Sequence, residues 1–216
     1  MPNLSFSNFD LRHKISSYHF YKINLKKAAL ETGLVVNSRS GSPFSYVYEG
    51  DINSDGSAKN DLFYIPRNQS EIQFAPIVDN NNVVLVTSQE QWERLDNYIS
   101  QDAYLSSRRG EYAERNGART PWNHQVDLKI VYKTIVFRKE IEVSLDIFNI
   151  FNLINKNFGA QTFVSNVNNS GFALLDFVKV ENKNPVFQYN NLQTKPWQVD
   201  SFSSRWQMQL GLKINL

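Results

Sequence analysis

The chain has 216 residues, with 23 basic and 21 acidic side chains and a formal net charge of +2. Because phosphate recognition needs a concentrated basic face, this balance argues against nucleic acid as a partner. The chain has no cysteine, which excludes disulfides and thiolate metal ligands. The mean hydropathy is −0.44, and no apolar run approaches the roughly 20 residues of a membrane helix. Membrane β-strands stay compatible with this value, because only every second residue of such a strand faces lipid.

The first predicted strands occupy residues 9–24 and 29–40. Phe9, Leu11 and Ile15 alternate with polar residues, and the phase of the alternation is uncertain after Ser17. The second segment alternates more clearly, from Leu30 onward. The connection at 25–28 is short, so the two segments predict an antiparallel hairpin.

A second hairpin is predicted from residues 122–134 and 138–152, joined by a tight turn at 135–137. Apolar residues alternate with charged ones in both segments. The charges are expected to face one another across the pair: Asp127, Lys129 and Lys133 opposite Glu140, Glu142 and Asp146. A fifth strand is predicted at 203–216, where Trp206, Met208, Leu210, Leu212, Ile214 and Leu216 alternate with polar residues or glycine.

Two long polar segments, 41–121 and 153–202, separate these strands and are expected to be loops. Within the first, Thr87 or Ser88 is followed three residues on by Glu90 or Gln91, which is a capping-box pattern. A short helix is therefore predicted near 88–105, with Trp92, Leu95 and Ile99 on one face. Alternating short turns and long loops are typical of membrane barrels, whose short turns are periplasmic and whose long loops are extracellular.

The fold class predicted is all-β, as a partial antiparallel transmembrane β-barrel. A soluble β-sandwich also has alternating strands, but its strands are usually about 5 to 6 residues long, shorter than those predicted here. Facing charges suit a hydrated lumen, and aromatics near strand ends suit interfacial girdles. These aromatics are Trp122, Phe148, Phe151 and Trp206.

Five strands are too few to close a membrane barrel, which needs about 8. An open sheet edge in hydrocarbon would leave amides unpaired at several kcal/mol each. We therefore expect a fragment, completed by missing strands or by other copies. Residues 1–7 have no signal-peptide pattern, so an export signal would lie elsewhere.

The last residues resemble the signal by which outer-membrane proteins are recognised for insertion. The matching positions are Gln209, Gly211, Ile214 and Leu216. The terminal residue is leucine where an aromatic is commonest.

A more specific resemblance rests on five motifs, in the order Asn8-Phe9-Asp10-Leu11-Arg12-His13, Ser40-Gly41-Ser42-Pro43-Phe44-Ser45-Tyr46, Asp51-Ile52-Asn53-Ser54-Asp55-Gly56, Glu114-Arg115-Asn116-Gly117-Ala118-Arg119-Thr120-Pro121-Trp122 and Asp146-Ile147-Phe148-Asn149-Ile150-Phe151-Asn152. Over nearly the whole chain, they resemble the last five strands of TonB-dependent outer-membrane receptors. The subgroup is the one with a carboxypeptidase-regulatory-like amino-terminal domain.

The resemblance implies a 22-stranded barrel in the cell outer membrane, filled by a plug domain and opened by a TonB-type energy-coupling protein. Its implied partners are outer-membrane lipid, the missing strands and plug, the coupling protein and the barrel-assembly machinery. The parent would import a scarce or large nutrient actively. Neither plug nor coupling box is found in this sequence, so the fragment alone is expected not to transport.

One segment matches the start of a calcium loop. Asp51, Asn53, Asp55 and Gly56 follow the D-x-N-x-D-G spacing, and Ser57 and Asp61 could add ligands. The twelfth position is Leu62 instead of a bidentate glutamate, so an ordinary Asp/Asn/Gly turn is an equal alternative. Structural calcium is the one cofactor suggested, and none is required.

Four arginines, Arg108, Arg109, Arg115 and Arg119, could hold an anionic substrate, but Glu111 and Glu114 between them favour a self-paired loop network. His13, His19 and His124 show no zinc-type spacing. No G-x-S-x-G or phosphate-cradling motif is present. The sequence therefore indicates no enzyme.

Two rival functions follow from the same residues. The first is a soluble calcium-dependent carbohydrate-binding β-sandwich, with Trp92, Trp122 and Trp197 as stacking platforms. The second is a small pore assembled from several copies. The sequence does not identify a substrate.

Overall fold

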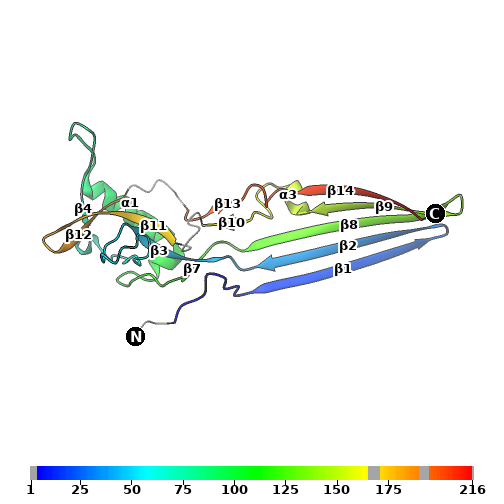
Figure 1. The fold of residues 1–216 in the computed structure, drawn as a ribbon, viewed down its shortest axis with the longest axis horizontal. Coiled ribbons are helices and arrows are strands. Elements are labelled where there is room, and N and C mark those ends of the chain that lie inside the picture. Colours follow the sequence, from blue (N-terminus) through cyan, green and yellow to red (C-terminus); the bar gives the residue numbers. More distant parts are fainter. Residues whose placement is uncertain (1–3, 165–170, 190–194, 216) are drawn as a thin grey trace. The chain divides into compact units, whose positions relative to one another are not determined.

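The computed structural model describes residues 4–164, 171–189 and 195–215. Strands make up most of its regular structure (Figure 1). The chain divides into two compact units. Unit 1 comprises Met1–Asp10, Ser42–Thr120 and Val164–Gln198, and unit 2 comprises Leu11–Gly41, Pro121–Phe163 and Val199–Leu216. Among the described residues, every helix is too short or too polar to span a bilayer.

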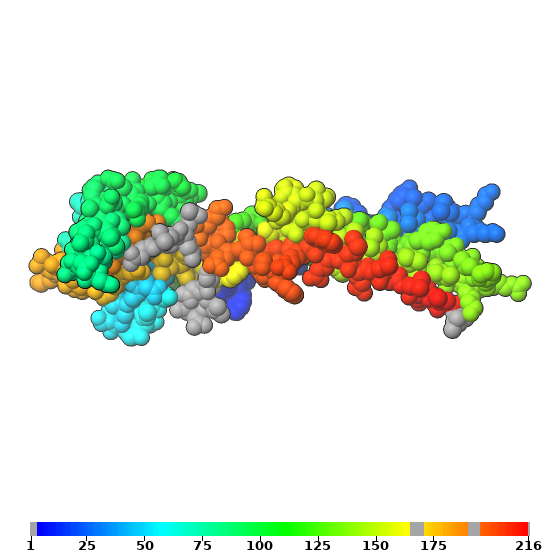
Figure 2. Space-filling model, turned by 90° about the horizontal axis from the view of Figure 1, so that it is seen from above, coloured from blue at the N-terminus to red at the C-terminus, as the bar shows by residue number. Residues whose placement is uncertain are grey.

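Unit 2 is built on one five-stranded antiparallel sheet in the order β1-β2-β8-β9-β14. Its strands are β1 (Lys14–Leu25), β2 (Ala28–Arg39), β8 (Asn123–Val136), β9 (Lys139–Phe148) and β14 (Gln207–Asn215). Figure 2 shows the blue atoms of β1 and the red atoms of β14 at opposite edges of this sheet. All five predicted strands are therefore present and form one sheet.

Tight turns join the paired strands at one end of the sheet. Only residues 26 and 27 separate β1 from β2, and residues 137 and 138 separate β8 from β9. Phe137 and Arg138 both have positive φ, at 49° and 62°, which is the backbone of a type I′ turn. Neither residue is the asparagine or glycine that such turns favour, so the type of this turn could not be predicted from the sequence.

Three strand boundaries differ from the prediction. The last strand, predicted from residue 203, begins at Gln207. Phe9 and Leu11 precede β1, which begins at Lys14. The strand predicted to reach residue 152 ends at Phe148, because Asn149 adopts a left-handed conformation (φ 54°, ψ 51°) and α3 (Ile150–Ile154) follows. Alternation alone did not reveal this change.

Unit 1 contains a second five-stranded sheet, in the order β4-β12-β11-β3-β7. Its strands are β3 (Pro43–Glu49), β4 (Gln73–Phe74), β7 (Ala118–Arg119), β11 (Gly171–Glu181) and β12 (Asn184–Gln188). The central strands β3 and β11 run parallel. The structure thus differs from the prediction that 41–121 and 153–202 are loops carrying one helix.

The core of unit 1 explains why these segments fold. It gathers fully buried aromatic and aliphatic side chains from β3, β11, the helices and the segment after β3, including Phe44, Tyr46, Phe63, Leu95 and Leu174. Burial raises the pKa of the Tyr46 hydroxyl, which donates to Asp102 Oδ2 at 2.7 Å. Asp102 also caps α2 (Ala103–Ser106), so this contact ties β3 to a helix terminus.

The predicted helix is confirmed as α1 (Ser88–Gln101), and its capping box is formed by Thr87 and Glu90. Leu95 and Ile99 are buried as expected, while Trp92 is only partly buried. Gln91 is fully buried as well. Its amide donates to Ala75 O and accepts from Tyr189 N, which the apolar pattern did not predict.

The remaining elements are short. They are η1 (Gln69–Glu71), β5 (Ile77–Val78), β6 (Val84–Val86), β10 (Thr162–Phe163) and β13 (Gln198–Val199). β5 and β6 pair as a hairpin in unit 1.

Candidate functional site

The sheet of unit 2 has one polar face, formed by alternate residues of all five strands. Paired residues in an antiparallel sheet share a face, so the register assigns each side chain. The charged and amide members of this polar face include Lys14, Lys22, Glu31, Asn37, Arg39, Asn123, Gln125, Asp127, Lys129, Lys133, Glu142, Asp146, Gln209 and Lys213.

Ion pairs link the strands across the polar face. Glu31 on β2 lies between two cations, 3.0 Å from Lys22 on β1 and 2.9 Å from Lys133 on β8. Lys129 contacts Asp146 on β9 at 2.8 Å. Lys133 and Lys129 are in direct register with Glu142 and Asp146, which confirms the predicted facing charges for these pairs.

The opposite face, here called the apolar face, is lined by hydrophobic side chains. It is exposed along β14 and partly exposed on the central strands, and only Val126 and Ile147 of its apolar residues on the described strands are buried. On β14, Leu210 is 75% and Leu212 is 68% exposed. Both are in register with apolar partners on β9, and those partners with further ones on β8. Its members include Leu30, Leu34, Leu128, Ile130, Tyr132, Ile141, Val143, Leu145, Met208, Leu210, Leu212 and Ile214.

An aromatic stack marks the end of the sheet away from the tight turns. Trp122 stacks with His13 at a ring separation of 6.1 Å and with His124 at 6.0 Å. His13 and His124 lie far apart in the sequence, and pairing of the strands brings them together. His19 is in register with Leu34 on the apolar face.

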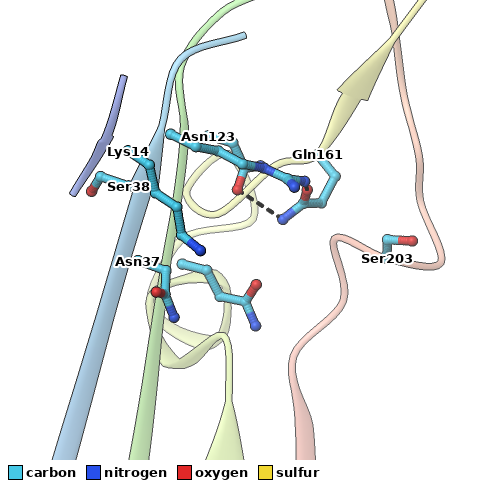
Figure 3. A pocket seen from close by; sticks show the side chains of 8 residues that line it. Lys14, Asn37, Ser38, Asn123, Gln161 and Ser203 are labelled. Carbon is cyan, nitrogen blue, oxygen red and sulfur yellow. Dashed lines mark hydrogen bonds between the residues drawn. The ribbon is translucent and has the colours of Figure 1, made fainter. Parts of the chain in front are cut away.

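A pocket opens at the same end of the sheet, on its polar face (Figure 3). Its volume is about 480 Å³, and it is lined by Lys14, Asn37, Ser38, Arg39, Asn123, Gln125, Gln161 and Ser203. Figure 3 shows the Lys14 side chain extending toward the space between Asn37 and Gln161. The lining comes from β1, β2, β8 and two loops of unit 2.

Hydrogen bonds hold one wall of this pocket in place. Arg39 Nη2 donates to Gln161 Oε1 at 2.8 Å, and Gln161 Nε2 donates to Asn123 Oδ1 at 2.9 Å. The Gln161 backbone N–H donates to Ser204 Oγ. The sequence did not single out these residues, because they are polar residues of four separate segments with no motif among them.

Three of the four arginines highlighted by the sequence are paired within unit 1. Arg108 contacts Glu114 at 2.9 Å, and this hydrogen bond raises the pKa of Arg108. Arg109 contacts Asp96 at 2.7 Å and also donates to Pro66 O. Arg119 pairs with Asp10. The predicted self-paired network is therefore confirmed for Arg108 and Glu114. Arg109 and Arg119 are paired too, but with acids outside the predicted set.

Arg115 differs, because its guanidinium has no ion pair among the described residues. It lines a smaller pocket of about 330 Å³ with Ser45, Val47, Ser57, Lys59, Asn60 and Leu62. Lys59 in this lining is paired with Glu49 at 2.9 Å.

The predicted calcium loop forms a series of side-chain-to-backbone turns. Asp51 accepts from the N–H groups of Asp55 and Gly56, at 3.0 and 2.8 Å. Asp55 accepts from Ser57 N–H and from the amides of Asn60 and Asn53, which lowers the pKa of Asp55. Asp61 accepts from the Ile52 N–H.

Within the residues that the structure describes, no group of three or more histidine, aspartate or glutamate side chains is close enough to hold a metal. Calcium binding by Asp51, Asn53, Asp55, Ser57 and Asp61 stays a prediction. Its test is whether calcium raises the melting temperature of the folded protein and protects residues 45–65 from protease.

Several residues of the family-like motifs are structural anchors. Asn116 Nδ2 donates to Phe6 O and Asn8 Oδ1, both at 2.7 Å, which ties the amino-terminal motif to the fourth one. Asn149 Nδ2 donates to Gly159 O and Ser204 O, and its N–H donates to Asp127. Both asparagines belong to the motifs, but the sequence did not predict the hydrogen bonds that they form.

The predicted insertion signal lies on β14. Gln209 and Gly211 are on the polar face and Ile214 is on the apolar face, while Leu216 lies outside the described residues. A Cβ added to Gly211 would lie 2.5 Å from Ser144 Oγ. This glycine therefore has a packing role as well.

The proposed stacking platforms of the carbohydrate-binding rival are divided between the two units. Trp92 and Trp197 pack against the core of unit 1. Trp122 belongs to unit 2 and stacks with two histidines.

Comparisons with protein-family models, with curated proteins and with solved structures found no match to this chain.

Proposed function

We propose that this chain forms part of the wall of an outer-membrane β-barrel, of the TonB-dependent receptor type, that imports a large or scarce nutrient. The apolar face of unit 2 contacts lipid and the polar face lines the hydrated lumen. Unit 1 contributes to the extracellular gate. The observation that carries the proposal is the separation of residue types between the two faces of one continuous sheet.

The exposure of the apolar face supports lipid as its environment. Soluble monomers rarely expose contiguous apolar patches above a few hundred Å². Here exposed leucine, isoleucine and methionine side chains follow β14 from Met208 to Ile214, beside apolar residues of β9 and β8. Strands of 9 to 14 residues also fit the roughly 9 to 11 residues that a tilted strand needs to cross a bilayer.

The charges of the polar face support a water-filled interior. Lys22, Glu31 and Lys133 form a chain of ion pairs whose members stay partly exposed. In hydrocarbon each charge would incur a large desolvation cost, whereas a lumen leaves it hydrated.

The free edges of the sheet support a larger assembly. In the described part of the chain, β1 pairs only with β2 and β14 only with β9. Their outer edges would leave amides unpaired in lipid at several kcal/mol each. Partner strands must therefore cover both edges, and the expected source is the rest of a parent receptor, with its plug, its energy-coupling protein and the machinery that inserts it.

Refolding separates this proposal from its rivals. The purified chain is diluted from denaturant into buffer, into detergent micelles or into phospholipid vesicles, and its far-UV circular dichroism and sedimentation are recorded. We expect aggregation in buffer and β-structure with an amphiphile. A monomer that folds cooperatively in plain buffer contradicts the proposal and favours the carbohydrate-binding sandwich. Discrete conductance steps in planar bilayers would favour a pore of several copies.

A further inference from the structure

The pocket at the end of the polar face has a chemistry that the barrel proposal leaves unassigned. Its volume, about 480 Å³, lies within the range of about 300–1,000 Å³ typical of small-molecule sites. Every lining residue is polar, and none is acidic. The pocket therefore offers hydrogen-bonding groups and positive charge without a carboxylate of its own.

The two cations of the pocket have different roles. Arg39 is fixed by its hydrogen bond to Gln161 and by strand pairing. The Lys14 ammonium has no hydrogen bond or ion pair within the described residues, and it points toward the open space (Figure 3). An unpaired cation beside a fixed one favours an anionic ligand.

The neighbouring acids are already engaged behind the lining. Asp127 accepts from Gln125 Nε2 at 3.1 Å and from the Asn149 N–H at 2.8 Å. Asp200 accepts from Ser203 Oγ and two backbone N–H groups, which lowers the pKa of Asp200. Both carboxylates orient lining side chains, and neither forms an ion pair with Lys14 within the described residues.

The amides set the rest of the specificity. Asn37 Nδ2 can donate and Gln125 Oε1 can accept, since neither has a hydrogen bond within the described residues. Asn123 and Gln161 are bonded to each other and form the fixed wall, and Ser203 adds a hydroxyl. Such a set matches hydroxyl groups, which also donate and accept. An inorganic anion would use the cations but would give the Gln125 carbonyl oxygen no donor.

We propose that this pocket binds a hydroxyl-rich organic anion, such as an acidic sugar. Lys14 and Arg39 contact its carboxylate, and the amides contact its hydroxyls. Only the identification of this ligand as the substrate class of the receptor depends on the proposed function. Binding itself depends only on the pocket.

The test is calorimetric titration of the 216-residue chain, folded in detergent micelles, with D-glucuronate, D-glucose and sulfate. We expect glucuronate to bind at least tenfold more tightly than glucose or sulfate. Lys14→Gln removes the unpaired charge without breaking a contact and should weaken glucuronate binding at least tenfold. Lys213→Gln, on the same face near the tight turns, is the matched control and should leave binding unchanged.

A second variant, Asn37→Asp, keeps the acceptor for the Ser16 hydroxyl but adds a negative charge, so it should also weaken glucuronate binding. Equal affinity for glucose and glucuronate, or an unchanged affinity in Lys14→Gln, overturns the inference. A chain that inserts into vesicles but binds none of the three probes overturns this site and leaves the barrel proposal standing. A chain that binds glucuronate and also folds in plain buffer contradicts the barrel proposal and leaves this site standing.

Discussion

Lys133 on β8 lies 2.9 Å from Glu31 on β2, across 102 residues of sequence. Glu31 also holds Lys22 on β1, so one carboxylate joins three neighbouring strands. The contact exists only because the register places all three side chains on the polar face. It therefore reports directly on the pairing of β1, β2 and β8.

The first prediction concerns this bridge. Glu31→Gln should lower the thermal midpoint of the folded chain, and the loss should shrink at high salt because the pair is partly exposed. A double-mutant cycle with Lys133→Gln should show coupling, since the two side chains touch. Glu140→Gln, next to a tight turn, is the control. Additive effects of Glu31→Gln and Lys133→Gln would show that the two residues do not interact.

The second prediction concerns Gly211. Its Cβ position lies 2.5 Å from Ser144 Oγ, so in Gly211→Ala the Ser144 hydroxyl must leave its present rotamer, which should destabilise the sheet by about 0.5–1.5 kcal/mol. Adding Ser144→Ala makes room and should recover most of this loss, as measured by urea unfolding in micelles. If insertion in cells stays defective while stability recovers, Gly211 acts in the insertion signal. If stability does not recover, the packing explanation is wrong.

The third prediction compares two arginines of unit 1. Arg109 contacts Asp96, Pro66 O and Ser100 Oγ, so Arg109→Gln should lower the unfolding free energy by about 1 kcal/mol. Arg115→Gln should leave stability unchanged, because Arg115 has no ion pair in the described part of the chain. Urea unfolding of both variants checks this. Equal destabilisation would mean that Arg115 has a structural role.

The fourth prediction concerns acid. Glu90 accepts from the Thr87 N–H and hydroxyl, which lowers the pKa of Glu90 below its ordinary 4.5. Because the folded pKa is lowered, this contribution to stability is present above pH 4.5 and is lost as the pH falls through the folded value. Glu90→Gln retains an acceptor without the charge, so unfolding of α1, followed by circular dichroism, should depend less on pH in this range. An unchanged pH profile would contradict the role of the carboxylate.

Thr87→Ala is the companion variant for the same cap. It removes the side chain that accepts from the Glu90 N–H at 3.2 Å and should cost about 1 kcal/mol of stability at neutral pH. Thermal unfolding measures it directly. Ser106→Ala, in the short α2, serves as a helical control and should change the midpoint little.

The sheet of unit 2 was largely predictable, because alternation over 9 to 14 residues is a strong signal for a two-faced strand. The prediction fails at the ends of the strands. Phe9 and Leu11 continue the apolar pattern although the backbone is not yet a strand, and Asn149 ends β9 through its left-handed backbone.

The fold of unit 1 was not predictable in the same way. Phe44 to Tyr48 are buried on both sides of β3, so this strand shows no alternation. Its partner β11 lies more than a hundred residues away and runs parallel. Consecutive buried residues cannot be distinguished from other apolar segments by period alone. The helix was found because its capping box is local.

The candidate pocket was missed for a related reason. Lys14, Arg39, Gln125 and Gln161 carry no common motif, and only the strand register and the loop after α3 bring them together. In contrast, the pair of Arg108 with Glu114 was anticipated, because the two residues are neighbours in the sequence.

Lipid contact of the apolar face can be measured residue by residue, because the chain has no cysteine of its own. Single cysteines at positions 208 to 215 of β14 are spin-labelled in vesicles, and collisions with oxygen and with a water-soluble nickel chelate are compared. We expect the accessibility of the labels to alternate with a period of two. Labels at positions 210 and 212 should be reached by oxygen, and labels at positions 209 and 213 by nickel. Equal access of nickel to all eight positions would contradict this expectation.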